Sequence, residues 1–150
     1  RRMIEGQAAE WAAERATDAD LQRLDQAFVA LQASFENDST ARRSDADIAF
    51  HQAIGDASHN VLIGHLSSAL LRLMHDNIRL NLGELKAVPA ASRLLMTQHS
   101  AIHAAVRERK PQAARAAAET HIDFVRETLA QTLRSVARRE TAERRLGSEL

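Results

Sequence analysis

The sequence has no cysteine, no tyrosine, one tryptophan, five glycines and two prolines among its 150 residues. Without cysteine the chain can form no disulfide, no thiolate metal site and no cysteine nucleophile. With so few glycines and prolines it also lacks the turn residues that a sandwich or barrel of many short strands requires. The composition therefore argues against strand-rich folds.

An excess of charge of one sign is also missing, because twenty Lys and Arg balance twenty Asp and Glu. This balance argues against a chain whose main task is to grip nucleic-acid phosphates, which requires clustered positive charge. No apolar run approaches the roughly 18 residues of a membrane span, and no signal peptide is visible. We therefore expect a cytoplasmic protein with no membrane partner.

The residues that are present indicate one globular domain. Hydrophobic residues make up 45% of the chain and charged residues 27%, and the length suits a single core. We expect one domain over residues 1–150, with a core over about 1–136 and a polar tail over 137–150. The chain opens at Arg1 in a helical pattern and without an initiating methionine, which indicates a piece of a longer protein.

Helical spacing of apolar residues recurs along the chain, with no alternation typical of strands. Pro89 and Pro111 suit the first turns of helices, where a missing N–H costs nothing. We expect helices over about 1–16, 18–35, 41–56, 60–83, 89–106 and 111–136, with a linker over 83–88. The fourth helix shows the apolar stripe Leu62, Leu66, Leu70, Leu73, Ile78 and Leu82. These elements predict an all-α bundle with short connections.

Metal-ligand residue types lie on three of these helices. Asp47 and His51 are four residues apart, so they share one face of a helix, while His99 and His121 lie on apolar faces of two others. Imidazole and carboxylate ligands suit zinc, nickel, iron or manganese. The alternatives are core histidines held by hydrogen bonds, a surface Asp47–His51 pair, or a competing pair formed by His99 and His103.

Other chemical motifs are missing from the sequence. There is no glycine-rich phosphate loop, no G-x-S-x-G nucleophile elbow and no H-E-x-x-H pair. The arginines near the C-terminus alternate with glutamates, which favours a solvated helix end over a nucleic-acid patch.

Several motifs in order resemble one known family. Asp47-Ile-Ala-Phe50-His51, followed by Ala57-Ser58-His59-Asn60, resembles the D-x-x-F-H…N signature of the FCD domain. That domain is the effector-sensing C-terminal half of FadR-type GntR transcriptional regulators. Residues 98–105 (QHSAIHAA) resemble its E-H-x-x-I-x-x-A motif, and Ala114 with His121 matches A-x6-H. Gln98 stands where the family has Glu, and Lys110-Pro111 stands where a Gly-Asp turn is common.

The resemblance implies an antiparallel bundle of six to seven helices that binds a divalent metal in its interior through Asp47, His51, His99 and His121. Zinc is the first expectation, with nickel, manganese or iron as alternatives. The resemblance further implies a small organic-acid carboxylate effector, a homodimer, and DNA contact only through an N-terminal winged helix-turn-helix domain absent from this chain.

Candidate effector contacts are Arg1, which matches a family position on the first helix, and Arg72 and Arg79 on the fourth, if these face inward. Arginine offers a bidentate fork to a carboxylate. Asn60 is a further candidate, although a cap at the start of the fourth helix is the simpler role.

Two other functions stay open from the sequence. A metal-dependent enzyme would use open metal positions to activate water, but no further carboxylate stands at a spacing that indicates a general base. A structural helical dimerisation module would use the histidines only as core residues.

Overall fold

The computed structural model describes residues 1–36, 39–86 and 88–147, and over these residues it contains six helices and no strand. The expected all-α bundle is therefore confirmed. The helices are α1 (Arg2–Arg15), α2 (Asp18–Phe35), α3 (Thr40–Ala57), α4 (Val61–Lys86), α5 (Pro89–Arg107) and α6 (Pro111–Gly147).

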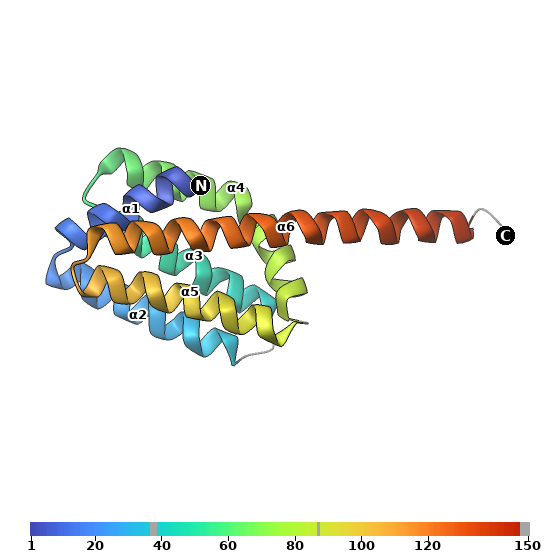
Figure 1. Cartoon of the computed structure of the whole chain (residues 1–150), viewed down its shortest axis with the longest axis horizontal. Coiled ribbons are helices and arrows are strands. Elements are labelled where there is room, and N and C mark those ends of the chain that lie inside the picture. Colours follow the sequence, from blue (N-terminus) through green and yellow to red (C-terminus); the bar gives the residue numbers. More distant parts are fainter. Residues whose placement is uncertain (37–38, 87, 148–150) are drawn as a thin grey trace.

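Helix α1 lies between two groups of helices, because it contacts α3 and α4 as well as α5 and α6 (Figure 1). Helix α3 packs on α2 and α4, and α6 packs on α5. The C-terminal part of α6 extends well beyond the bundle as a single projecting helix (Figure 1). The polar tail expected from residue 137 belongs to this projection, and its residues up to Arg145 are exposed.

Local sequence signals set most helix starts. Pro89 and Pro111 each open a helix, as their missing N–H predicts. The Ser39 side chain accepts a hydrogen bond from the Arg42 N–H at the start of α3. Asn60 caps α4 through its Oδ1, which accepts from the Ile63 N–H at 3.0 Å.

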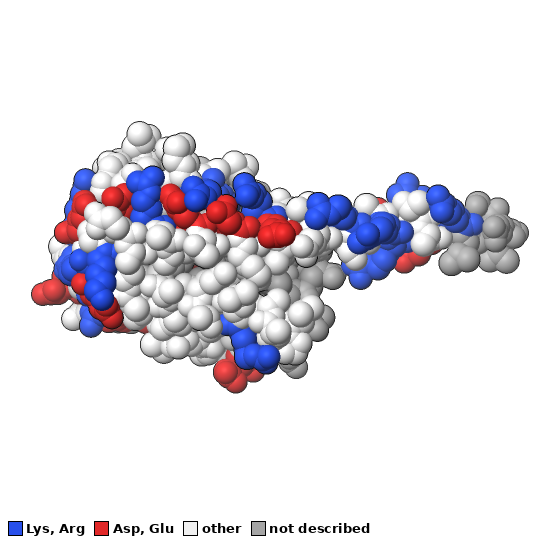
Figure 2. Space-filling view, in the orientation of Figure 1, with Lys and Arg blue, Asp and Glu red and all other residues white. Residues whose placement is uncertain are grey.

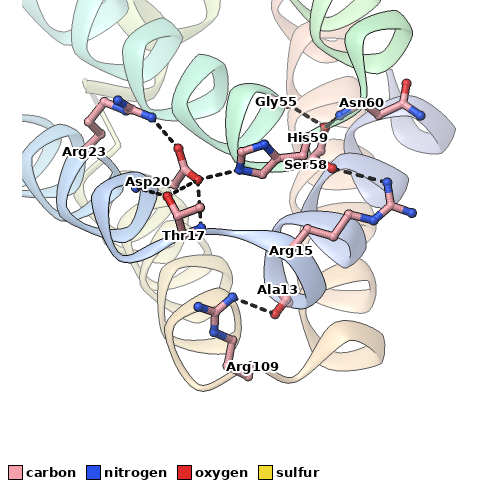
Figure 3. Close-up of polar contacts among 10 residues, drawn as sticks. All are labelled: Ala13, Arg15, Thr17, Asp20, Arg23, Gly55, Ser58, His59, Asn60 and Arg109. Carbon is pink, nitrogen blue, oxygen red and sulfur yellow. Dashed lines mark hydrogen bonds and ion pairs between the residues drawn. The ribbon is translucent and has the colours of Figure 1, made fainter.

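A buried carboxylate fixes the junction between α2 and the α3–α4 turn (Figure 3). Asp20 Oδ2 accepts from the Thr17 N–H at 2.8 Å, and Thr17 Oγ1 accepts from the Asp20 N–H at 3.2 Å, which together form a capping box. Asp20 Oδ2 also lies 2.6 Å from Nε2 of His59, whose backbone has a positive φ of 48°. His59 thus has an acidic partner that sequence spacing could not reveal, and this partner holds a backbone conformation that is costly for a non-glycine residue.

The core consists of small and branched apolar side chains. A main cluster joins the alanines of α1 to side chains of α2, α3, α5 and α6, and the largest of these that are fully buried are Leu24, Leu31, Phe50 and Ile102. A second cluster forms where α4 meets α5, around Leu71, Ile78, Leu82 and Leu95. The abundance of alanine in α1 is what allows this helix to pack closely between α3 and α6.

Two expectations for α4 were wrong. Leu62, Leu66 and Leu73 are exposed by 67%, 39% and 78%, because the buried face of α4 instead includes the polar residues Ser67 and Asn81. The helix also continues to Lys86 through the segment expected as a linker from residue 83. A single glycine inside a helix costs only about 1 kcal/mol, so Gly83 does not end it.

The Asp20 junction generates a prediction for stability. Asp20→Ala should lower the free energy of unfolding at pH 7 by about 1–2 kcal/mol, because it removes the carboxylate that accepts from the Thr17 N–H in the capping box. Burial raises the pKa of Asp20, but its contacts with Thr17, His59 and Arg23 outweigh burial and lower the pKa well below 3.8. The ionised carboxylate therefore stabilises the fold above pH 3.8, and this contribution declines as the pH falls below that value.

Urea denaturation at pH 7 and at pH 3 measures both effects. The matched control is Asp18→Ala, which changes an exposed carboxylate in the same first turn. If the two variants lost equal stability at pH 7, or if the Asp20→Ala deficit were as large at pH 3, this account of the junction would be wrong.

Candidate metal centre

Three buried histidines from three helices meet in the interior of the bundle. His51 of α3, His99 of α5 and His121 of α6 each offer a ring nitrogen, and these nitrogens all lie within 4.8 Å of one another. The three residues are exposed by 6%, 0% and 1%. The structure thus brings together three of the four residues expected as metal ligands.

Packing on Phe50 sets the orientation of two of these rings. The Phe50 ring is fully buried and meets His51 and His99 edge-on, with ring centroids 5.5 Å and 5.4 Å away. His121 lies 4.4 Å from His99 and 5.1 Å from His51, again between ring centroids. The D-x-x-F-H pattern therefore places a candidate ligand, His51, and the phenylalanine that packs against its ring on one helix.

Asp47, the fourth expected ligand, lies next to the histidine group. It shares the buried face of α3 with His51, one turn away, and its Oδ1 lies 3.0 Å from His99 Nε2. Its carboxyl group is buried, which alone would raise its pKa, but the neighbouring His99 and His51 outweigh burial and lower the pKa. Asp47 is therefore an ionised oxygen donor at the edge of the group.

Burial controls the charge of the imidazoles. It lowers the pKa of His121 well below 6.5, with further lowering from the other two histidines, and it lowers the pKa of His99 despite the nearby Asp47. Burial acts in the same direction on His51, but Glu5 and Asp47 outweigh it and raise its pKa. His99 and His121 are therefore neutral at pH 7, which is the form that ligates metals.

The donor set fits a divalent transition metal. His51 Nε2 is buried without a hydrogen-bond partner among the described residues, and His99 Nε2 has the Asp47 carboxylate 3.0 Å away. Unsatisfied buried polar atoms are rare and costly, and a bound ion is one of the standard reasons for them. Imidazole nitrogens with one carboxylate oxygen match the ligand preferences of zinc and of other first-row metals.

Two polar side chains contact the histidines from outside, and sequence reasoning did not assign them this role. Glu5 of α1 is exposed by 6%, and its Oε2 lies 3.1 Å from His51 Nδ1. Gln98 of α5 places its Oε1 3.3 Å from His121 Nδ1. Burial raises the pKa of Glu5, but His51 and Arg1 outweigh it and lower the pKa to about 2. One signal was available, because Glu5 is in register with the buried alanines of α1.

A small cavity of about 10 Å³, room for about one water, adjoins the histidines. It lies between the N-terminal end of α1 and helices α3, α4, α5 and α6, and its lining combines apolar side chains with four polar ones, Arg1, Asp47, Asn81 and His121. Arg1, one of the expected effector contacts, therefore lines this cavity. Asn81 was not among the residues expected from the sequence. Its Nδ2 donates a hydrogen bond to Thr128 Oγ1 at 3.1 Å, which fixes its side chain.

The other candidate effector contacts lie away from this cavity. Arg72 and Arg79 are on the exposed face of α4, so the expectation that they face inward is wrong. Asn60 caps α4, as the simpler alternative had it. His103, the competing partner of His99, instead places its Nε2 2.7 Å from Asp25 Oδ1 and stacks on Phe28.

The surface carries mixed charge rather than a field of one sign. Figure 2 shows Lys and Arg interspersed with Asp and Glu along α6, where ion pairs link this helix to α1 through Arg2–Glu119, Arg2–Asp123 and Arg115–Glu10. Among the residues that the structure describes, none of the helices is both long enough and apolar enough to span a bilayer.

Comparison with curated proteins gives relatives that are named as transcriptional regulators. The Glc operon transcriptional activator of Escherichia coli (strain K12) is 31% identical over 132 residues, which cover 86% of this chain and 52% of that protein. The HTH-type transcriptional regulator LutR of Bacillus subtilis (strain 168) is 35% identical over 133 residues, or 86% and 58% of the two chains. The chain thus spans about half the length of these relatives.

A solved structure shows the same fold. E. coli McbR/YncC superposes with a TM-score of 0.69 at 20% sequence identity, covering 90% of this chain and 65% of that one. The family model of the FCD domain matches residues 1–124, which include all three histidines, Asp47 and the cavity residue Arg1. With the all-α bundle and the motifs at Asp47–His51 and Gln98–Ala105, this match shows that the chain belongs to the FCD domain family.

Proposed function

We propose that this chain is the effector-sensing domain of a GntR/FadR-type transcriptional regulator. It binds a small organic-acid carboxylate at an interior divalent metal, and it modulates DNA binding by a winged helix-turn-helix domain on the N-terminal side. Three buried imidazole nitrogens that converge within 4.8 Å carry this proposal. The relatives are named as regulators and extend beyond the length that this chain covers, which supports a partner domain.

The residues of the proposed metal site are His51, His99, His121 and Asp47. When bound, a divalent metal with an open position supplies the positive charge that offsets the lost hydration of an incoming carboxylate. The chain's own contribution is to hold neutral imidazoles in a dry interior, since burial lowers the pKa of His99 and His121. Zinc suits this donor set best, and nickel, manganese or iron are alternatives.

Arg1 is the proposed contact for the effector carboxylate. It lines the cavity together with Asp47 and His121, so a ligand there can meet the guanidinium and the metal ligands at once. Arginine recognises carboxylates through a planar fork of N–H donors. Two further Escherichia coli relatives are named for the operons that they regulate, an L-lactate dehydrogenase operon and a galactonate operon. Lactate and galactonate are organic acids, which is compatible with an acid as the effector of this chain.

The small size of the cavity supports a sensing role. Its volume of about 10 Å³ is less than any organic acid needs, so binding requires its walls to part. Four of the six helices and Arg1, the residue before α1, contribute to those walls, so their movement would change helix positions across the bundle. A sensor needs only different affinities for two conformations, and such movement would supply that difference without any bond-making residue.

His121→Ala should abolish both metal retention and the thermal stabilisation by small organic acids, because it removes one ligand and opens the interior. Metal analysis of the purified protein, followed by a thermal-shift screen of acids with and without zinc, measures both. The matched control is His65→Ala, which changes an exposed histidine on α4. A wild-type protein that holds no metal, or that is indifferent to every acid in the presence of zinc, would contradict the proposal.

Arg1→Ala should weaken binding of a responsive acid by about 10–100-fold, the range expected when a hydrogen-bonded pair loses its charged donor. Arg72→Ala, which changes an exposed arginine outside the cavity, should leave the affinity unchanged. Isothermal titration of the zinc-loaded proteins with the acid that gives the largest thermal shift compares the two. Equal affinities for both variants would remove Arg1 from the effector site.

A further inference from the structure

Glu5 is an ionised carboxylate in the interior of the bundle. It lies in α1 with 6% of its surface exposed, on the face that also carries the buried Ala8, Ala9 and Ala12. Burying a charge is costly unless it is paired, and a carboxylate on a helix face of alanines has no packing reason to be there. Its partners therefore indicate what it does.

The two oxygens of Glu5 face two different groups. Oε1 accepts a hydrogen bond from Arg1 Nε at 2.6 Å, one turn earlier on α1. Oε2 lies 3.1 Å from Nδ1 of His51, on α3. The carboxylate thus bridges a cavity residue and a histidine of the metal centre, and it connects two helices that are far apart in sequence.

The position of Glu5 assigns the two nitrogens of His51 to different roles. Nδ1 faces Glu5, whereas Nε2 is buried and has no hydrogen-bond partner among the described residues. A proton on Nδ1 directed at Glu5 leaves the lone pair of the buried Nε2 available to a metal. Carboxylates behind metal-bound histidines commonly fix the tautomer and orientation of the ring in this way.

We propose that Glu5 is a positioning residue of the metal centre, which orients the His51 imidazole through Nδ1 and is itself held by Arg1. This inference rests on the metal binding of the proposed function and adds a fifth residue to that site, behind its ligands. The two oxygens of Glu5 are directed at Arg1 and at Nδ1 of His51, so in this proposal Glu5 acts through His51 and not as a ligand.

Gln98 provides an internal comparison within the same site. Its amide oxygen faces Nδ1 of His121 at 3.3 Å, so His121 has a neutral partner in the place where His51 has a charged one. A carboxylate raises the basicity of the ring it contacts more than an amide does. Glu5 should therefore contribute more to metal affinity than Gln98 does.

The experiment compares zinc affinity in Glu5→Ala and Glu5→Gln by competition with a chromophoric chelator at pH 7. Glu5→Ala should weaken zinc binding by about 10–100-fold, the usual loss when an outer partner of a metal ligand is removed. Glu5→Gln preserves the side-chain volume and an acceptor oxygen but not the charge, so its loss should be smaller. Gln98→Ala should lose less than Glu5→Ala.

Glu10→Gln is the matched control, because it makes the same change on α1 at a residue paired with Arg115. It should bind zinc as the wild type does. A second measurement separates positioning from general stability. In zinc-loaded protein the Nδ1 proton of His51 should give a slowly exchanging NMR signal, which should exchange faster in Glu5→Gln and Glu5→Ala but not in Glu10→Gln.

The outcomes distinguish this inference from the proposed function. If the wild type binds zinc and both Glu5 variants bind it equally tightly, with an unchanged His51 signal, the positioning role is wrong and the proposed function stands. If the wild type itself binds no zinc or other divalent metal, both are wrong. A graded loss from wild type through Glu5→Gln to Glu5→Ala supports the inference.

Discussion

Close packing of three imidazole rings in a dry interior is the constraint on which the rest of this structure depends. Burial makes the charged form of each ring costly, so His99 and His121 are held neutral. His51 differs, because the carboxylates of Glu5 and Asp47 stabilise its protonated form and raise its pKa. The charges of the interior therefore balance, but its hydrogen bonds are incomplete, because His51 Nε2 has no hydrogen-bond partner among the described residues. A bound cation would satisfy that nitrogen and displace the proton of His51.

The same constraint explains how the helices are arranged around the centre. α3, α5 and α6 each carry one histidine, and they must stay in register for the rings to meet. Phe50 fills the space beside two of the rings, and the alanines of α1 let that helix approach closely enough for Glu5 to reach His51. Arg1 then connects the centre with the neighbouring cavity. A movement of the cavity walls would thus also displace Arg1 and Glu5, and through them the His51 ring.

Much of this was predictable from the sequence. Proline at the start of a helix and apolar periodicity located four helices closely, and the spacing of Asp47 and His51 placed them on one face. Residue types on apolar helix faces gave the four metal-ligand candidates, the resemblance to the FCD family supported them, and the family itself is now shown. Apolar periodicity alone could not reveal that the three helices face one another.

Most of the failures share one physical cause, which is that apolar periodicity does not register polar residues that are buried because they have partners. On α4 the apolar pattern favoured Leu62 and Leu73, whereas the buried face contains Asn81, which donates to Thr128. On α1 it passed over Glu5, and at the α3–α4 turn it could not pair His59 with Asp20, 39 positions away. Arg72 and Arg79 were candidates because arginine suits a carboxylate, and both are exposed.

Anomalous X-ray diffraction at the zinc absorption edge, from crystals grown with zinc, tests the central claim most directly. The account predicts one strong anomalous peak per chain, enclosed by His51, His99 and His121. Crystals with no peak there, or with zinc only at exposed histidines such as His65, would contradict it.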